Sequence, residues 1–139
     1  MSKGAEIGSS TARRPFYEYL GIVVEEAADG RSRVAVAGKP EISNARGDVH
    51  GGAVASLLDA AMGVAARSSL EPGTGATTVS LTVQYLEPGR GALTATGRVV
   101  RAGRSLVATE ASVTDAGGVL VAHAVGTMRV LRPRKTEGA

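Results

Sequence analysis

Residues 44–67 read NARGDVHGGAVASLLDAAMGVAAR, and the fold can be predicted from this stretch. Between residues 51 and 66 only Asp59 is ionisable, and most of the other residues are Ala, Leu, Val or Met. Ala and Leu are among the best helix formers, and apolar residues on all sides of a helix are typical of a buried helix. About 16 residues are too few to span a bilayer, so we expect the central core helix of a soluble protein.

Asp59 is an unusual residue for such a helix, because a buried carboxylate without partners costs several kcal/mol or shifts its pKa. It could be structural, if it pairs with a buried hydroxyl or faces a solvated edge, or it could be functional. The flanking residues favour a function: Asn44 lies six residues before His50, and Gly51-Gly52 begins the helix. A helix N-terminus offers unpaired N–H groups and a positive dipole end, which would stabilise a carbonyl oxygen that becomes negative.

This spacing resembles that of a known family. The pattern is Asn44-x5-His50-Gly51-Gly52-x6-Asp59, followed by a Val/Thr-rich run that ends Tyr85-Leu86-Glu87-Pro88. It resembles the hotdog-fold acyl-CoA thioesterases of the phenylacetate-degradation (PaaI-like) type, over roughly residues 14–132. The resemblance implies the hotdog fold, hydrolysis of a small aryl- or medium-chain acyl-CoA, no cofactor, and a site at the interface of a homodimer or a dimer of dimers.

Composition and length set limits on the class of protein. The chain has 139 residues, with 43% apolar and 21% charged residues, which is typical of one globular domain. The absence of Cys excludes disulfides and Cys-ligated metals, and two His far apart give no credible metal site. No apolar run follows the first Lys, so we expect no signal peptide and a cytoplasmic protein.

The net charge is +3, and arginines and lysines concentrate in residues 98–104 and 129–135. They could form a solvated basic face, or they could attract a partner that carries phosphate. Nucleic acid is not expected, because the basic residues do not alternate with aromatic residues suited to base stacking and no nucleic-acid module is recognisable. The expected partners are an acyl-CoA substrate and further copies of the chain, without a membrane.

Turn signals and hydrophobic periodicity divide the chain into its elements. We expect a one-turn helix at 15–20, a hairpin of strands 22–26 and 31–37, a loop at 37–46, the central helix to about 69, and strands at 77–85, 92–102, 105–114 and 119–131. One helix with about six antiparallel strands predicts an α+β fold with the sheet wrapped round the helix, and the last four strands are expected to form a meander. The whole chain, 1–139, is expected to be one domain with loose tails at 1–12 and 133–139.

Three residues are the candidates for the reaction itself. Asp59 could act as general base or as covalent nucleophile on a thioester, and nothing in the sequence separates these roles. The backbone N–H of Gly51 is the candidate oxyanion donor, although a Gly here could also serve close helix packing. Asn44 could position the attacking water or the thioester oxygen, or it could bond its own backbone as loop Asn residues often do.

Supporting roles follow from the same resemblance. His50 is expected to orient the loop or the carbonyl, Gly52 to lie at the substrate, and Thr78 to supply a hydroxyl beside Asp59. Some relatives carry a Thr one turn after the carboxylate, where this chain has Gly63, and others have Glu in place of Asp. His123, within a Val/Ala strand, is expected to be a packing position.

Arg101 and Arg104 flank Gly103 at a tight turn and could bind the phosphates of coenzyme A, or simply be solvated.

Two other functions remain open. A hotdog hydratase or dehydratase is one, although no Gly-Asp-x-Asn-Pro-x-x-His string is present. A non-catalytic acyl-CoA-binding protein is the other, although Asp59 is retained. Gly51 and Asp59 are eight residues apart, about 12 Å along a helix axis, so one thioester cannot contact both in one subunit. If both act, a two-fold dimer must bring them together from different subunits.

Overall fold

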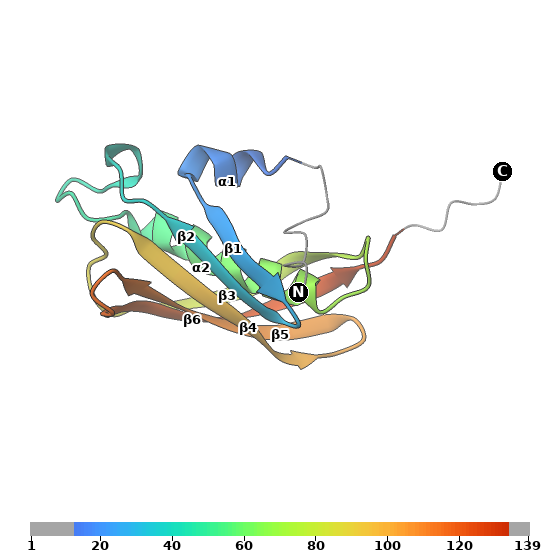
Figure 1. Ribbon diagram of the computed structural model, residues 1–139. Helices are drawn as coiled ribbons and strands as arrows, with labels where there is room; N and C mark the ends of the chain where they lie inside the picture. Colours follow the sequence, from blue (N-terminus) through green and yellow to red (C-terminus); the bar gives the residue numbers. More distant parts are fainter. Residues whose placement is uncertain (1–12, 134–139) are drawn as a thin grey trace, which may run out of the picture.

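The computed structural model of the protein describes residues 13–133. The expected tails lie outside these residues, apart from Pro133. The elements follow the predicted order, with a short 3-10 helix inside the expected loop at 37–46. They are α1 (Pro15–Leu20), β1 (Val23–Ala28), β2 (Arg31–Val36), η1 (Pro40–Ile42), α2 (Gly51–Ser68), β3 (Gly75–Tyr85), β4 (Leu93–Ala102), β5 (Leu106–Asp115) and β6 (Leu120–Leu131) (Figure 1).

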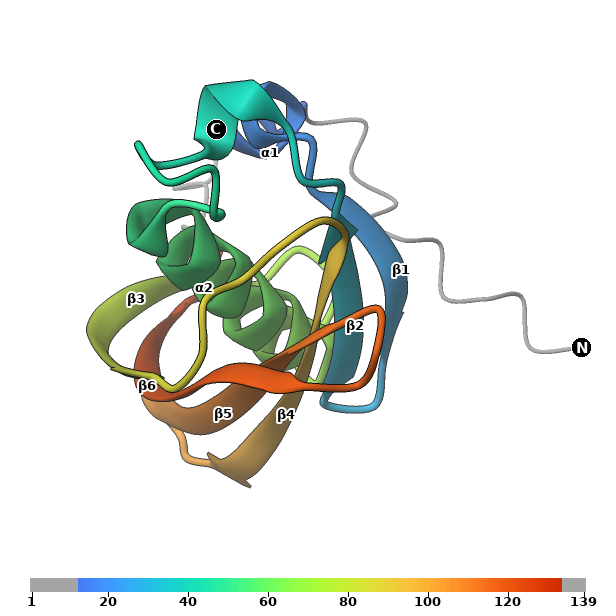
Figure 2. The ribbon, with the colours of Figure 1, turned by 90° about the vertical axis from the view of Figure 1, so that its left-hand side faces the viewer.

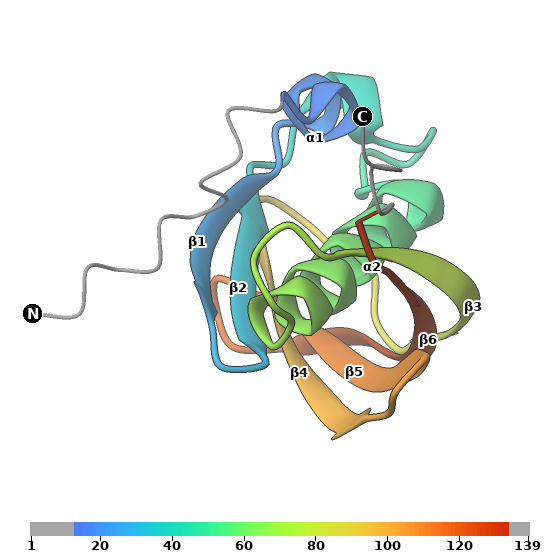
Figure 3. The same ribbon diagram turned by 90° about the vertical axis from the view of Figure 1, so that its right-hand side faces the viewer.

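All six strands form one antiparallel sheet in the order β1-β2-β4-β5-β6-β3. The expected meander of the last four strands is therefore wrong, because only β4, β5 and β6 follow one another. α2 carries the chain to the far side of the sheet, where β3 pairs with β6 and not with β4. The sheet curves round α2, with β1 at one edge and β3 at the other (Figures 2 and 3).

Burial of small and aliphatic side chains between α2 and the sheet forms the core. α2 comes so close to the sheet that a Cβ at Gly97 of β4 would lie 2.5 Å from the carbonyl oxygen of Ala61. Ser32 of β2 donates a hydrogen bond of 2.6 Å to the same carbonyl. The largest fully buried side chains come from both layers: Leu57, Leu58, Met62, Leu93, Met128, Val34, Val107, Val113 and Val121.

α2 is nevertheless not buried on all sides, contrary to the prediction. Gly52 is exposed, and Ala55, Ser56 and Asp59 are half-buried, so one face of the helix lies open to solvent in the single subunit. The prediction failed because small residues such as Ala and Gly suit an open or shared face as well as a core. No helix among residues 13–133 is long and apolar enough to cross a membrane.

The two edge strands differ in a way that affects assembly. Both show a shift in register, but β1 has only six residues and carries Glu25 and Glu26, and a short, charged strand discourages edge-to-edge pairing. β3 has eleven residues, GATTVSLTVQY, none of them charged and none of them Pro. Most of its side chains are exposed, including Val79 at 58% and Tyr85 at 54%. An edge of this kind is suited to pairing with another strand.

Candidate active site

The first turn of α2 contains one backbone donor without a partner. His50 is the N-cap, and its Nδ1 accepts a hydrogen bond of 2.8 Å from the N–H of Gly52. The N–H groups of Ala53 and Val54 both donate to the carbonyl of His50. Within the described residues, the N–H of Gly51 is the only donor of these four that has no hydrogen-bond partner. In this first turn, only the Gly51 N–H is therefore free to bind an acceptor at the positive end of the helix dipole.

The His50 ring is fixed by the same arrangement. Because Nδ1 accepts the hydrogen bond from Gly52, it carries no proton, and the proton of the neutral ring lies on Nε2. His50 thus holds the loop onto the helix. The N–H of Gly52, which was expected to lie at the substrate, is already occupied by this contact.

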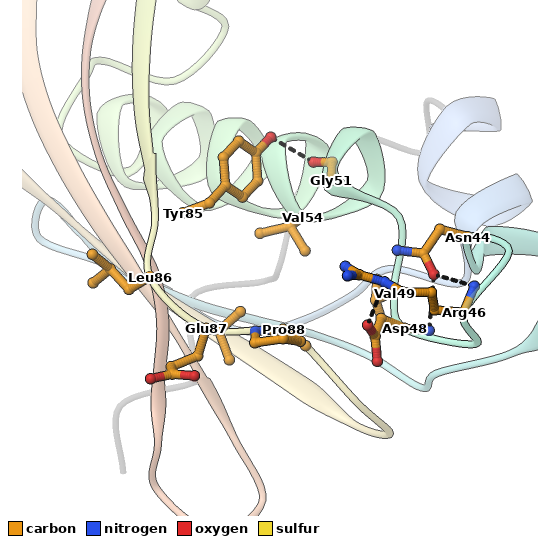
Figure 4. A pocket seen from close by; sticks show the side chains of 12 residues that line it. Asn44, Arg46, Asp48, Val49, Gly51, Val54, Tyr85, Leu86, Glu87 and Pro88 are labelled. Atoms are coloured by element: carbon orange, nitrogen blue, oxygen red, sulfur yellow. Dashed lines mark hydrogen bonds and ion pairs between the residues drawn. The ribbon is translucent and has the colours of Figure 1, made fainter.

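Gly51 lies in the wall of a cavity of about 350 Å³, which we call the loop cavity. The hydroxyl of Tyr85, at the end of β3, donates a hydrogen bond of 2.7 Å to the Gly51 carbonyl (Figure 4). A Cβ at residue 51 would lie 3.5 Å from the Tyr85 ring, which is an ordinary contact. Gly51 is therefore held from two sides, by Tyr85 of β3 and by the loop of residues 44–50 that precedes it. The loop cavity is lined by Asn44, Arg46, Asp48, Val49, Gly51, Val54, Tyr85, Leu86, Glu87, Pro88, Gly89 and Val121.

Asn44 lies in the same wall. The sequence suggested two roles for it, bonding its own loop or donating to the substrate, and the two ends of its side-chain amide suit one role each. Its Oδ1 accepts hydrogen bonds from the N–H groups of Arg46 at 3.0 Å and Asp48 at 3.1 Å, as expected of a loop Asn. Its side-chain nitrogen points away from these contacts and towards the cavity (Figure 4). The oxygen therefore fixes the loop, while the NH₂ group is available as a donor beside Gly51.

Sequence reasoning missed Asp48, which is a buried carboxylate beneath the same loop. Its side chain is 4% exposed and accepts a hydrogen bond of 2.6 Å from Nε of Arg90, with Nε of Arg46 3.5 Å away. The N–H of Val49 also donates to the carbonyl of Gly89. These contacts tie the Asn44 loop to the segment after β3. The available signal was an acidic residue two positions before the His-Gly-Gly, but its partner lies 42 residues away.

Asp59 lies two turns along α2, beside the middle of the edge strand. The hydroxyl of Thr78 donates a hydrogen bond of 2.6 Å to Oδ1 of Asp59, and lies 3.4 Å from the sulfur of Met128. Oδ2 has no hydrogen-bond partner within residues 13–133, and the side chain faces the open side of α2. A partly exposed carboxylate with one free oxygen can accept a proton from water or attack an electrophile.

The single subunit thus holds two half-sites. Asn44 and Gly51 line the same cavity at the N-terminus of α2, and Asp59 and Thr78 are hydrogen-bonded two turns away. Eight residues of helix separate Gly51 from Asp59, which corresponds to about 12 Å. The structure brings together the members of each pair but does not bring the two pairs together.

A family model described as “Thioesterase superfamily” matches residues 46–122, which include Gly51, Asp59 and Thr78 and begin two residues after Asn44. The chain belongs to the thioesterase superfamily. A protein of Halobacterium salinarum named “Putative esterase” is 40% identical over 125 residues, which cover 82% of this chain and 83% of that protein.

Two solved structures extend the comparison. A thioesterase family protein from Silicibacter pomeroyi matches with a TM-score of 0.83 and 26% identity, covering 87% of this chain and 92% of that chain. The E. coli PaaI protein from the phenylacetic acid degradation operon matches with a TM-score of 0.78 and 25% identity, covering 84% of each chain. The hotdog fold and the family resemblance predicted from the motif are confirmed, and the protein is a thioester hydrolase.

Other candidate residues of this thioesterase lie away from Gly51. Arg101 and Arg104 line a separate cavity of about 470 Å³ at the β4–β5 turn. In the sheet, Leu106 pairs with Arg129, which pairs with Thr77, so this turn lies at the Asp59 end of the subunit. His123 is a half-buried residue of β6 whose Nδ1 lies 2.9 Å from the hydroxyl of Ser112 on the neighbouring strand.

Proposed function

We propose that the protein hydrolyses a small aryl- or medium-chain acyl-CoA to the free acid and coenzyme A, at a site shared by two subunits. The observation that carries this proposal is the unpartnered Gly51 N–H at the N-terminus of α2, with Asn44 beside it. A hydrogen-bond donor at a helix N-terminus suits the oxygen of a thioester carbonyl, which becomes negative during attack. The PaaI protein and the other thioesterases of the same fold support this substrate class.

Pairing of β3 with the β3 strand of a second subunit would form the shared site. Tyr85 contacts Gly51 and Thr78 contacts Asp59, so the position of each half-site is tied to a position along β3. Antiparallel pairing centred between Leu81 and Thr82 would place Thr78 opposite the partner's Tyr85. Asp59 would then lie beside the partner's Gly51, twice in each two-fold dimer. The uncharged, exposed β3 edge is suited to this contact.

The proposed reaction uses the two half-sites together. The thioester oxygen accepts the hydrogen bond from the Gly51 N–H, and the Asn44 amide donates to the same oxygen or to the attacking water. Asp59 of the other subunit either removes a proton from that water or attacks the carbonyl carbon itself. In the first route the hydroxide adds to the carbonyl carbon, the bond from carbon to sulfur breaks, and the proton taken by Asp59 passes to the sulfur, so that coenzyme A leaves as the thiol. In the second route an Asp59 oxygen displaces the sulfur to form a mixed anhydride, and water then hydrolyses this anhydride to the free acid and restores Asp59, with one proton of the water going to the coenzyme A thiolate. Thr78 donates to one Asp59 oxygen and so keeps the other directed at the substrate.

The nucleotide end of coenzyme A is assigned to Arg101 and Arg104. Their cavity lies at the Asp59 end of the same subunit, and guanidinium groups bind phosphate with two parallel hydrogen bonds. In the shared site these arginines would therefore belong to the subunit that supplies Asp59.

The proposal is tested by incubating the protein with a panel of acyl-CoAs and a thiol-detecting reagent. We expect release of free thiol from phenylacetyl-CoA and hexanoyl-CoA, and loss of turnover in Asp59→Asn with substrate binding nearly intact, because Asp59 acts on the chemistry. Binding of the acyl-CoAs without thiol release from any of them would refute the proposed hydrolysis. An Asp59→Asn variant with near-normal kcat would remove Asp59 from the reaction.

A further inference from the structure

A second cavity lies on the other side of the α2 N-terminus. This groove of about 220 Å³, which we call the α1 groove, lies between α1, η1 and the first turns of α2. Figure 2, which looks towards the N-terminal end of α2, shows α1 and the η1 segment above it. Phe16 and Tyr19 line the groove from α1, and Ala53 and Ser56 line it from α2.

The α1 groove and the loop cavity meet at the candidate oxyanion donor. Gly51 lines the loop cavity, whereas His50 and Gly52, the residues on either side of it, line the α1 groove. A carbonyl group bound at the Gly51 N–H therefore has one cavity on each side. A thioester likewise has two arms, the acyl group on the carbonyl carbon and the pantetheine chain on the sulfur.

The two cavities differ in chemistry as the two arms do. Beside apolar residues such as Val54 and Leu86, the loop cavity carries an amide, a guanidinium and a carboxylate, from Asn44, Arg46 and Glu87. Phe16, Tyr19, Leu20, Ile42 and Ala53 form the apolar half of the α1 groove lining, beside Glu41, Ser43, His50, Gly52 and Ser56, and Phe16 and Tyr19 are 59% and 71% exposed. Two large aromatic side chains left exposed beside a candidate active site are suited to contact with an apolar ligand.

From this we infer that the α1 groove binds the acyl group of the substrate, while the pantetheine arm, with its two amides, lies in the loop cavity. The inference rests on the proposed thioester hydrolysis and identifies the part of the chain that selects the acyl group. An apolar cavity of about 150 Å³ is enough to hold benzene, so a groove of about 220 Å³ has room for one aromatic ring and the short link to the carbonyl. Phe16, Tyr19, Ala53 and Ser56 are the specificity-determining residues.

A binding measurement tests the inference without turnover. The chain contains no Trp, so Phe16→Trp introduces a single indole into the wall of the α1 groove. The probes are S-phenacyl-coenzyme A, S-acetonyl-coenzyme A and free coenzyme A, of which the first two are thioethers that cannot be hydrolysed. We expect the phenacyl compound to shift the Trp emission to shorter wavelength, and the acetonyl compound and coenzyme A to leave it nearly unchanged. Binding of the phenacyl compound, measured by calorimetry, without any change in emission would overturn the inference.

A kinetic measurement tests the residues on α2. Ser56→Leu fills the groove from the half-exposed face of the helix with a strong helix former. We expect kcat/KM for phenylacetyl-CoA to fall more than tenfold and that for acetyl-CoA to change less than threefold. The control Thr96→Leu replaces a hydroxyl side chain by Leu at an exposed position of β4 and is expected to change neither.

The two measurements separate the inference from the proposed function. An equal fall for both substrates in Ser56→Leu, or no fall for phenylacetyl-CoA, would contradict the α1 groove as acyl site. If the wild-type protein hydrolyses no thioester, the proposed function fails. The Trp emission then still decides whether the groove holds the acyl arm of a bound acyl-CoA.

Discussion

Gly51→Pro removes the candidate oxyanion donor and little else. Residue 51 is the first residue of α2, where proline is favoured in helices. His50 has φ −57° and ψ 139°, and this extended ψ lies in the range that a residue before proline prefers. Because the Gly51 N–H has no partner within the described residues, its loss breaks no hydrogen bond of the fold. Replacing Gly by a compatible Pro stabilises a protein by about 0.4–1 kcal/mol, so the melting temperature should stay or rise by a few degrees.

The expected effect on the reaction is large. Loss of one oxyanion donor raises the activation barrier by about 2.7–4 kcal/mol, which is roughly a 100- to 1,000-fold fall in kcat. kcat/KM should fall by the same factor, because the donor acts on the transition state more than on the bound substrate. The measurement is steady-state thiol release with phenylacetyl-CoA, together with thermal unfolding of each variant.

Gly51→Ala is the matched control for this variant. It adds a Cβ in ordinary contact with Tyr85 but keeps the N–H, so kcat is expected within about threefold of the wild-type value. A Gly51→Pro variant that is folded and has the same kcat as Gly51→Ala would refute the assignment of this N–H as the oxyanion donor.

Three further predictions concern the other parts of the site. Thr78→Val should lower kcat roughly 10- to 100-fold, because a hydrogen bond to a charged group is worth about 1.5–3 kcal/mol; Thr78→Ser should keep most of the activity, and equal kcat values for the two variants would argue against a role for the hydroxyl. Asp48→Asn should lower kcat about tenfold and reduce the free energy of unfolding by about 1–3 kcal/mol, since the buried charged partner of Arg90 is lost. Unfolding curves and kinetics together check this, and an unchanged kcat would show that the contact between Asp48 and Arg90 does not affect catalysis. If Arg101 and Arg104 bind the phosphates of coenzyme A, KM should rise with ionic strength while kcat barely changes. A constant KM from low to high salt would show that both arginines are solvated surface residues that do not bind the phosphates.

Local signals predicted most of the fold. The turn at Asp29-Gly30 has positive φ at both residues, 52° and 78°, as a two-residue hairpin of this type requires. The long Ala/Leu run correctly predicted α2, and alternation correctly predicted the four later strands. The position of β3 beside β6 was not predictable in this way, because strand pairing over 50 residues depends on how the sheet closes round the helix and not on local pattern.

The site was predictable to a similar degree. The family resemblance predicted a hydroxyl from Thr78 beside Asp59, and the structure shows this hydrogen bond between β3 and α2. Asn44 and Gly51, which belong to the same motif, line one cavity. Asp48 was missed, since its importance depends on Arg90, which approaches from a distant loop. The open face of α2 was missed too, because Ala and Gly do not distinguish a buried surface from one that another subunit can cover.

Mixing of two inactive variants tests the shared site most directly. Asn44→Ala and Asp59→Ala are combined under conditions of subunit exchange, and formation of hybrid dimers is followed with differently tagged chains. In each hybrid dimer, one site keeps both residues and the other site lacks both. With random exchange half of the dimers are hybrids, so about a quarter of wild-type activity is expected to return. Hybrid dimers that form but stay as inactive as the two parents would contradict it.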